Sequence, residues 1–513
     1  MSGAALWACL ELPALPLDVF ARARTPDDTR PFAVGTGGHT PRLVLADAAA
    51  CEAGLRPGQL VSAALALAPD LVLRDRDPAA EAAALARVAT WIAQFTPMVT
   101  LAPPVAVLAD IGGSLRLFGG RQRLAALLAA GARDLGYTAR LAFAPTPAAA
   151  LAFARAGLVG TATPSALDAA LAPLPLAHFD IEPAARELLA AAGVATFGAA
   201  AALPRDGLAR RAGPAFVQTL DRARGAIPDP RPPFVPPPRY EGRLELPAAV
   251  ERTDALAFAV QRLVHELAGW LLGRGLGIVE LSLALAHERH VAIRGAAPAT
   301  AVRFALAAPA REPAHLIAVL RDRLARVALP APVVAITLAS EATAPLAGRN
   351  LGLLPGADAS ATVPLVDRLR ARLGEDAVFR VRPHPEHRPE RAWKLVKAGA
   401  PPNAAPGKPT ARKPRSIPDP RTSAGAQALA AMADSPRPAW LLAEPEPLGH
   451  HLEARPWVLR DGPERIESGW WDGADVRRDY FIAESPRGER VWIYRDHRYG
   501  ADDGEWFLHG FFA

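Results

Sequence analysis

Two carboxylate side chains, Glu11 and Asp110, are of a type that can bind a divalent metal ion. Glu11 lies two residues after Cys9, and Asp110 lies in the apolar run that continues into Ile-Gly-Gly-Ser114. Mg²⁺ prefers carboxylate oxygens, whereas a thiol suits zinc or copper. Nucleotidyl transfer needs two such metal ions about 4 Å apart. One carboxylate alone would not assemble that pair of ions.

The segment around Asp110 resembles the central palm hairpin of Y-family DNA polymerases, whose pattern is close to S-I-D-E-A-F-L-D-V-T-G-S. Leu108-Ala-Asp-Ile-Gly-Gly-Ser114 matches the second half, while Val105 and Ala106 replace the adjacent Asp-Glu pair. Cys9 stands at the metal-binding Asp of the family's first strand. The resemblance implies a palm without catalytic carboxylates, so we expect no metal, no cofactor and no catalytic residue.

The positions that grip the incoming nucleotide in the family also differ. In the counterpart of N-Y-x-A-R-x-x-G, Ala48 and Cys51 replace the Tyr and Arg that hold the triphosphate. In the counterpart of G-I-x-x-N-K-x-x-A-K, Leu151 replaces a lysine. The resemblance therefore implies no nucleotide-binding residues.

Length and composition allow three or four domains in this 513-residue chain, half of which is hydrophobic. The net charge of +6 gives a mild bias towards polyanions. Two cysteines, Cys9 and Cys51, exclude a disulfide framework and indicate a reducing, cytoplasmic compartment. We expect both thiols to be buried, although they could approach one another. No uninterrupted apolar run is long enough to predict a membrane span.

The order of elements predicts an α+β fold of the Y-family polymerase type. Strands at 5–11, 99–101, 105–111 and 138–143, with helices at 79–95 and 117–135, give the βαββαβ order of a ferredoxin-like palm. The expected domains are a palm at 1–165 with a fingers insertion at 12–78, a helical thumb at 166–227, a stiff Pro-rich linker at 228–238 and a little finger at 239–345. The little finger repeats the βαββαβ order, with strands 240–246, 277–285, 301–307 and 333–339 and helices 254–273 and 313–327.

Candidate DNA-binding residues lie in the thumb and the little finger. Leu188–Gly198 and the following Leu-Pro predict a helix, a turn at Gly193 and a second helix, which resembles a helix-hairpin-helix module. Such a turn can offer backbone N–H groups to a phosphate. The expected basic contacts are Arg205, Arg210 and Arg211 in the thumb and Arg243, Arg294 and Arg303 on the little-finger sheet. The alternative is that these arginines are simply solvated.

The region after the little finger carries possible interaction segments. Asn350-Leu-Gly-Leu-Leu354 resembles a degenerate sliding-clamp peptide, in which Asn350, Leu353 and Leu354 would be the contacts. It belongs to a connector at 346–397, which includes a helix at 363–373. The histidines of 384–393 suggest either a metal site or a polar loop, and we favour the loop.

The C-terminal part differs in composition from everything before it. Residues 398–436 are rich in Pro, Ala, Gly and basic residues, which predicts a disordered linker. Residues 437–513 contain six of the ten tryptophans and predict a small β-rich module. Aromatic residues dominate protein interfaces but also fill small cores. The partner contacts that we expect are Trp470, Trp471, Tyr480, Phe481, Trp506 and Phe507.

Taken together, these segments resemble the ImuB family, the polymerase-like subunit of the bacterial mutasome. The tail Gly462–Asp472, Arg-Asp-Tyr-Phe481 and Trp-Phe-Leu-His-Gly510 are its most specific parts. The resemblance implies a non-catalytic adaptor in damage-induced mutagenesis and translesion synthesis. Its implied partners are primer–template DNA, the β sliding clamp, a RecA-like protein (ImuA) and an error-prone C-family polymerase (ImuC), without a membrane.

Two alternatives remain open. The first is an active, atypical translesion polymerase that uses Glu11 and Asp110. Asp110 lies five residues after Val105, about 16 Å along a strand, which is too far to substitute for the missing carboxylates. The second alternative is a protein–protein scaffold that does not bind DNA, although the thumb and little-finger patterns favour a DNA-binding protein.

Overall fold

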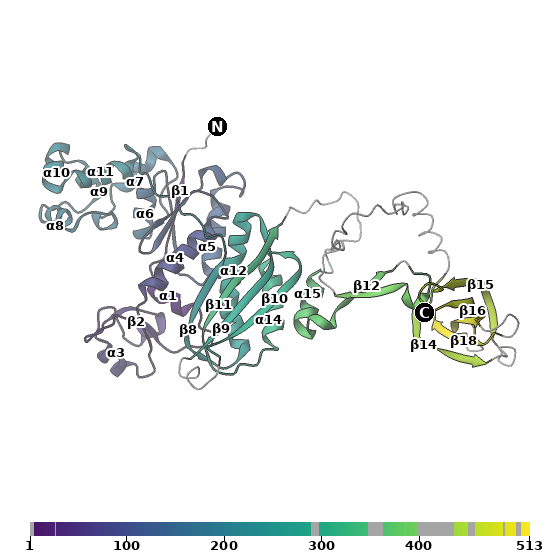
Figure 1. Cartoon of the computed structure of the whole chain (residues 1–513). Coiled ribbons are helices and arrows are strands. Elements are labelled where there is room, and N and C mark those ends of the chain that lie inside the picture. The colour runs from purple at the N-terminus through teal and green to yellow at the C-terminus, as the bar shows by residue number, and fades with distance from the viewer. Residues whose placement is uncertain are drawn as a thin grey trace. The chain divides into compact units, whose positions relative to one another are not determined.

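The computed structural model describes residues 5–25, 27–288, 297–346, 363–384, 386–397, 436–449, 457–485, 488–498 and 504–512. The chain divides into two units, Met1–Gly374 and Glu375–Ala513 (Figure 1). Each unit has its own sheets and cores. Among the described helices, none is both long and apolar enough to cross a membrane.

The palm is a four-stranded antiparallel sheet in the order β5-β6-β1-β7. These strands are β1 (Trp7–Glu11), β5 (Val99–Ala102), β6 (Ala106–Asp110) and β7 (Arg140–Ala144). One face packs against α4 (Pro78–Ile92) and α5 (Arg121–Asp134), and the other packs against α6 (Pro147–Arg155). The predicted ferredoxin-like palm is confirmed. Helix α5 begins later than predicted because Gly119 and Gly120 have positive φ angles of 76° and 100°, which end any preceding helix.

The fingers form a separate small lobe between β1 and α4, after α1 (Leu15–Ala21). Its three-stranded sheet has the order β3-β2-β4. The strands are β2 (Phe32–Gly35), β3 (Leu43–Ala46) and β4 (Val72–Asp75), with α2 (Ala48–Glu52) and α3 (Val61–Leu67) beside them. Asp47 caps α2, because its carboxylate accepts the Ala50 N–H at 2.8 Å.

The thumb is entirely helical, as predicted. It contains α7 (Leu167–Leu171), α8 (Pro183–Ala191), α9 (Phe197–Ala201), α10 (Arg205–Ala212) and α11 (Pro214–Arg224). Short 3₁₀ turns lie at Pro164–Ala166, just before α7, and at Leu176–His178; a third, Gly112–Ser114, lies in the palm between β6 and α5. Phe179 and Phe197 stack with ring centroids 5.0 Å apart in the thumb core.

The little finger is a second four-stranded antiparallel sheet in the order β10-β9-β11-β8. Its strands are β8 (Glu241–Val250), β9 (Leu276–His287), β10 (Ala299–Ala310) and β11 (Val333–Pro345). Its helices are α12 (Thr253–Arg274) and α14 (Pro313–Leu324), followed by α15 (Val363–Leu373). Leu281, Leu283 and Leu285 alternate with half-buried residues and face the helices. This apolar alternation explains why the strands were predictable.

The Pro-rich linker is bound at several points along its length. The Phe234 N–H donates to the Val99 carbonyl at 2.7 Å, and the Thr100 hydroxyl donates to the Pro232 carbonyl at 2.7 Å. The Trp270 indole N–H of α12 donates to the Pro237 carbonyl at 3.0 Å. The linker therefore lies along palm strand β5 and ends against α12.

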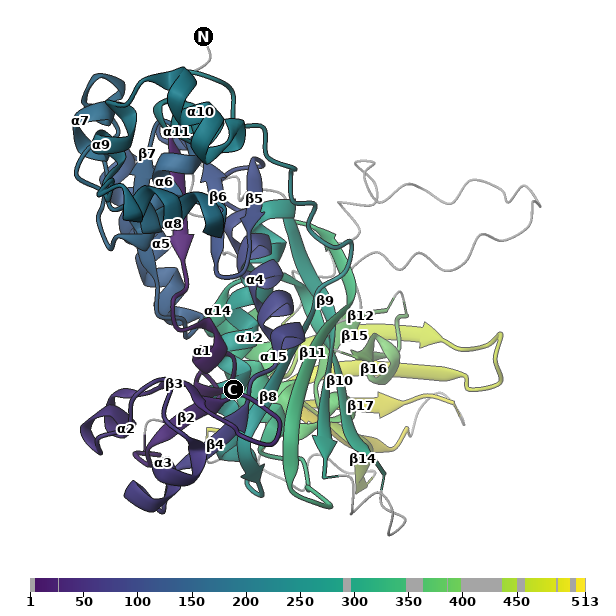
Figure 2. The same ribbon diagram turned by 90° about the vertical axis from the view of Figure 1, so that its left-hand side faces the viewer.

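Palm helix α4 and little-finger helix α12 lie side by side (Figure 2). At their contact Arg22 pairs with Glu266 at 2.5 Å, and both side chains are essentially inaccessible to solvent. Arg87 of α4 also reaches Glu266, at 3.2 Å. The Trp91 ring occupies space beside Gly131 and Gly269, where a β-carbon would come within about 2.3 Å of it. The palm and little finger thus share a buried, charged contact.

The second unit contains a hairpin and a five-stranded sheet. The hairpin is β12 (Phe379–Pro383) with β13 (Trp393–Lys397), and 3₁₀ turns lie at Glu375–Ala377 and Pro389–Arg391. The sheet has the order β14-β18-β17-β16-β15. Its strands are β14 (Trp440–Gly449), β15 (Val458–Ser468), β16 (Val476–Glu484), β17 (Arg490–Asp496) and β18 (Trp506–Phe511). The module is therefore β-rich, as predicted, but its unit starts at Glu375 instead of residue 437.

Candidate functional site

The three positions that would carry catalytic carboxylates lie on the neighbouring palm strands β1 and β6, or just before the start of β6. Cys9 lies between Leu108 of β6 and Ala142 of β7, and its side chain is fully buried. Ala106 packs in the same apolar cluster as Cys9, and Val105 packs against the cluster on the other face of the sheet. The strands thus bring Cys9 and Ala106 onto one face of the sheet, with Val105 on the other, and the three side chains supply only sulfur and hydrocarbon groups.

The Cys9 thiol is poorly suited to binding a metal. Burial raises its pKa well above the usual range of a thiol, and the negative charge of nearby Glu11 adds to this shift. The metal-binding form of cysteine is the thiolate, and this environment disfavours it. Among the described residues, no group of three or more His, Cys, Asp or Glu side chains could hold a metal ion.

The two carboxylates singled out from the sequence, Glu11 and Asp110, lie at opposite ends of the β1–β6 strand pair. Glu11 is opposite Ala106, whereas Asp110 is opposite Trp7, four positions away in the same register. Four residues of antiparallel strand span about 13 Å, so the two carboxylates cannot share a pair of metal ions. Each has a local partner: Arg140 lies 3.6 Å from Glu11, and the Gly112 N–H donates to Asp110 at 3.0 Å. This separation removes the geometric basis for an active polymerase that uses these two residues.

The expected nucleotide-binding positions are also apolar or remote from solvent. Leu151 of α6 is buried in the same cluster as Cys9, while Ala48 and Cys51 begin and continue fingers helix α2. Both cysteines are free thiols. A cavity of about 330 Å³ adjoins Leu151, and two of its arginines are internally paired. Arg155 pairs with Asp180 at 2.7 Å, and Arg231 pairs with Asp229 at 2.8 Å.

The thumb presents part of the predicted DNA-binding set. Gly193 forms an exposed turn after α8 with a positive φ of 73°, which suits the turn of the predicted helix-hairpin-helix module. Arg205 forms a two-bond ion pair with Asp221, with one bond at 2.8 Å. Arg210 and Arg211 are exposed at the end of α10. A second glycine turn, Gly213 with a φ of 89°, follows them and was not singled out from the sequence, although Gly-Pro is a turn signal.

The little-finger arginines lie in less favourable surroundings for DNA than we expected. Arg243 forms an ion pair with Glu245 at 2.7 Å on the open face of the sheet. Arg303 is exposed on the same face. Arg294 lies outside the described residues, as do the clamp-peptide residues Asn350, Leu353 and Leu354. These assignments stay predictions, and the acidic neighbours of Arg243 weaken the case for that residue.

The six predicted aromatic contacts of the second unit divide into surface and core. Trp470 and Trp471 form an edge-to-face pair, with centroids 5.3 Å apart, and are 78% and 57% exposed. Tyr480 is the opposite case, because it is buried, stacks on Trp492 at 4.0 Å and bonds His509 at 2.9 Å. This burial weakens the prediction that Tyr480 contacts a partner, which stays a prediction.

The remaining predicted aromatic contacts also take part in packing within the unit. Phe481 packs on Trp506 at 5.3 Å, and Phe507 stacks on Tyr494 at 5.2 Å. All three of these predicted residues are half-buried. Trp440 is 69% exposed and was not predicted as a contact. The exposed tryptophans of this unit are therefore the stronger candidates for a partner surface.

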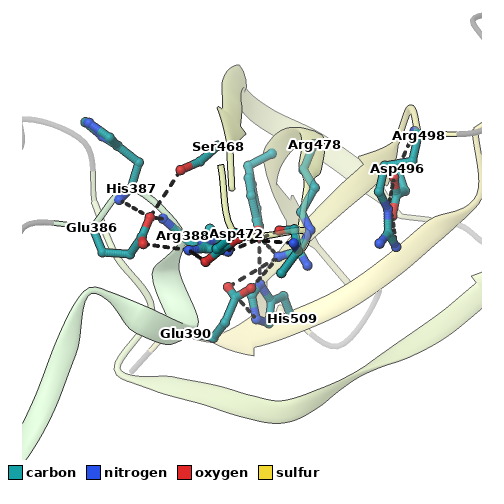
Figure 3. Close-up of polar contacts among 12 residues, drawn as sticks. Glu386, His387, Arg388, Glu390, Ser468, Asp472, Arg478, Asp496, Arg498 and His509 are labelled. Atoms are coloured by element: carbon teal, nitrogen blue, oxygen red, sulfur yellow. Dashed lines mark hydrogen bonds and ion pairs between the residues drawn. The ribbon is translucent and has the colours of Figure 1, made fainter. Parts of the chain in front are cut away.

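Arg388 anchors the loop that carries Trp470 and Trp471, a role that the sequence did not reveal (Figure 3). Its guanidinium is buried and bonds both oxygens of Asp472, at 3.0 and 2.6 Å, and Glu386 at 2.7 Å. It also lies over the Trp471 ring, with its carbon 5.8 Å from the centroid. Arg388 holds the pKa of Glu386 and of Asp472 down to about 2. Residues 386–391 therefore form a polar loop with a 3₁₀ turn, as favoured from the sequence, and this loop is a structural part of the C-terminal unit.

A second polar cluster binds the same segment to the sheet. Glu390 lies 3.2 Å from Arg478 and 4.0 Å from His509 (Figure 3). Burial lowers the pKa of His509 to about 4, with Arg478 acting in the same direction and Glu390 opposing it. These contacts explain why Glu375–Lys397 belongs with the later strands. The sequence feature that could have pointed to this packing is the dense His387-Arg-Pro-Glu-Arg391 motif.

Comparison with known proteins relates this chain to one family. The sequence profile of the impB/mucB/samB family matches residues 19–155. Protein ImuB of Caulobacter vibrioides, from strains NA1000 and ATCC 19089, is 34% identical over 483 residues, which cover 90% of this chain and 100% of that protein. Among solved structures, a Dbh–Dpo4 chimera of Y-family DNA polymerases and DinB from Sulfolobus solfataricus are each 13% identical and cover 65% of this chain and 98% of their own. Their TM-scores are 0.38 and 0.37. At this level of identity and coverage to Protein ImuB, the chain belongs to the ImuB family.

Proposed function

We propose that this protein is a non-catalytic, polymerase-like adaptor in DNA damage-induced mutagenesis and translesion synthesis. The observation that carries the proposal is the apolar burial of Cys9 and Ala106, with Val105 beside them, at the positions of the catalytic carboxylates. Without oxygen ligands at these positions, the palm has nothing to hold two catalytic metal ions. A role on DNA places the protein in the cytoplasm.

The proposed task is positioning. The thumb, through the Gly193 turn and the exposed Arg210 and Arg211, holds primer–template DNA by phosphate contacts. The exposed Trp470 and Trp471 recruit a partner protein. Proposed partners are the β sliding clamp, bound through Asn350–Leu354, a RecA-like ImuA protein and an error-prone C-family polymerase, ImuC. Several weak linked contacts would give avidity without one strong site.

Primer extension by the full-length protein tests the absence of catalysis. The purified protein is incubated with a primed template, dNTPs and Mg²⁺ or Mn²⁺, at concentrations where a gel shift detects bound DNA. We expect bound DNA and no added nucleotide. Extension that disappears in the Glu11→Ala variant would overturn the proposal, since it would show that Glu11 contributes to a working metal site.

A scaffold that does not bind DNA is the second candidate, favoured by the ion pair that occupies Arg243 on the little-finger sheet. The Arg210→Ala/Arg211→Ala variant distinguishes the two functions. If the thumb holds phosphates, this variant lowers DNA affinity and flattens its salt dependence, because fewer counterions are released. If the wild-type protein gives no gel shift at low salt, the scaffold is the correct function.

A further inference from the structure

The open face of the little-finger sheet carries an unusual set of charges. Helices α12 and α14 cover one face, on which Leu281, Leu283 and Leu285 are buried. The Asp, Glu, Lys and Arg residues of the four strands all lie on the other face, where register and alternation place them. They are Glu241, Arg243, Glu245, Glu280, Arg303 and Glu341.

Four glutamates against two arginines give this face a net charge of −2, in a chain whose overall net charge is +6. Arg243 is paired with Glu245 at 2.7 Å. The Glu341 carboxylate accepts a hydrogen bond from the Ser282 hydroxyl at 2.5 Å, and it forms no ion pair within the part of the chain that the structure describes. The face therefore opposes the basic character of the rest of the protein.

Small side chains fill the space between these charges. Across the sheet, Arg303 faces Ser282, which faces Ala339, which faces Glu241. The adjacent row consists of Ala301, Ala284, Thr337 and Arg243. A partner backbone could approach such a surface closely. Strands of this length, about 35 Å long in a sheet about 17 Å wide, offer roughly 600 Å² to one partner. That area is at the low end for a specific interface.

This combination disfavours DNA and favours a cationic polypeptide. Proteins gain affinity for DNA when Lys and Arg neutralise phosphates and release counterions, and glutamates repel the same phosphates. Lysine or arginine side chains of a partner would instead meet Glu241, Glu280 and Glu341. We propose that the open face of the little-finger sheet docks a lysine- or arginine-rich segment of a partner protein, while DNA is held elsewhere, at the thumb.

The test measures peptide and DNA binding by the same full-length variants. The peptide probe is a fluorescein-labelled chain of alternating lysine and alanine, long enough to cross the four strands. The face variant is Glu241→Gln/Glu280→Gln/Glu341→Gln. The matched control removes three exposed carboxylates of the fingers, as Asp27→Asn/Glu52→Gln/Asp70→Asn. Because all six side chains lie away from the buried cores, both variants should fold, which a thermal melt verifies.

We expect the face variant to weaken peptide binding by about tenfold at low salt, since exposed ion pairs contribute modestly and three are lost. The control variant should change it by less than about twofold. Equal peptide affinities of the two variants would overturn the proposal. In the DNA arm, Arg243→Ala/Arg303→Ala should leave primer–template affinity unchanged. A loss as large as that of Arg210→Ala/Arg211→Ala would make this sheet a DNA surface.

The two arms separate this inference from the proposed function. Loss of DNA binding in the thumb variant together with selective loss of peptide binding in the face variant supports both. Selective peptide loss without any DNA binding by the wild-type protein would support the docking face and reject the DNA adaptor. DNA binding that depends on Arg243 and Arg303 would keep the adaptor and reject the docking face.

Discussion

Replacing Glu266 with glutamine should release the contact between the palm and the little finger. Glu266 forms ion pairs with both Arg22, at 2.5 Å, and Arg87, at 3.2 Å. Among the described residues, it is the only carboxylate paired with these two arginines. Tyr137 also hydrogen-bonds Arg22, and Tyr240 donates to Glu266 at 3.3 Å. Glutamine keeps the volume of glutamate but removes its charge, so the buried guanidinium of Arg22 and the half-buried guanidinium of Arg87 would remain without a counter-charge.

The size of the effect follows from the burial of the group. Breaking a buried ion pair by removing one partner costs about 3–5 kcal/mol, because the remaining charge stays desolvated. Two arginines depend on Glu266 here, so we expect the upper part of that range. For a unit of this size, about 2 °C of unfolding temperature corresponds to each kcal/mol. The expected decrease is therefore about 8–10 °C.

Thermal unfolding followed by circular dichroism measures this decrease in the full-length protein. Glu241→Gln is the matched control, because that carboxylate is exposed, and its unfolding temperature should equal that of the wild type. The triple variant Arg22→Met/Arg87→Met/Glu266→Met removes all three charges and should unfold near the wild-type temperature. A Glu266→Gln variant that unfolds within about 1 °C of the wild type would refute the reasoning, as would a triple variant that loses as much stability.

Three further predictions concern other parts of the chain. Arg388→Met should loosen the tryptophan loop and increase acrylamide quenching of tryptophan fluorescence, and Arg388→Lys should not restore it, because a single ammonium cannot make the bidentate pair; unchanged quenching would contradict this role. The pKa of folded His509 is about 4, so this side chain stays neutral at pH values where an unfolded histidine already binds a proton. The free energy of unfolding of the second unit should therefore be constant above about pH 6.5 and decrease as the pH falls from about 6.5 to 4. Fluorescence-detected melts measure this dependence. His509→Gln should remove that slope, and a wild-type slope confined below pH 4 would contradict it. Cys9→Asp should lower the unfolding temperature with or without Mg²⁺, because the new carboxylate would be buried without partners; stabilisation by Mg²⁺ would show that a metal site persists.

Much of the first unit was predictable because its elements are amphipathic over long stretches. The strand predicted at 277–285 is β9 (Leu276–His287), and the helix predicted at 254–273 is α12 (Thr253–Arg274). Each element buries one regular face, and this regularity is a property of the sequence alone. Where glycines interrupted the hydrophobic period, the predicted start of a helix was wrong. Helix α5 starts four residues late, since two positive-φ glycines precede it.

The proximity of Cys9 and Ala106 in the palm was also predictable, because it required only an alignment of local motifs. Cys9 and Ala106 come together through strand pairing that any palm of this type must make. The Arg388 anchor was different. It pairs with Asp472, which is 84 residues away in the chain, and no local pattern specifies such a partner. The burial of Tyr480 could not be predicted either, since an aromatic residue type does not reveal whether its ring packs in a core or on a surface.

The replacement of carboxylates in the palm has a physical logic of its own. In an active centre, adjacent carboxylates repel each other and are desolvated, and only bound metal ions compensate for that strain. Once metal binding is no longer needed, residues such as Cys9 and Ala106 can pack with Leu108 and Ala142 without any buried charge. Apolar replacement of buried charges is often stabilising, and loss of a strained active site commonly increases stability. Under the proposed non-catalytic function, such a palm would therefore be a more rigid support for the partners that it positions.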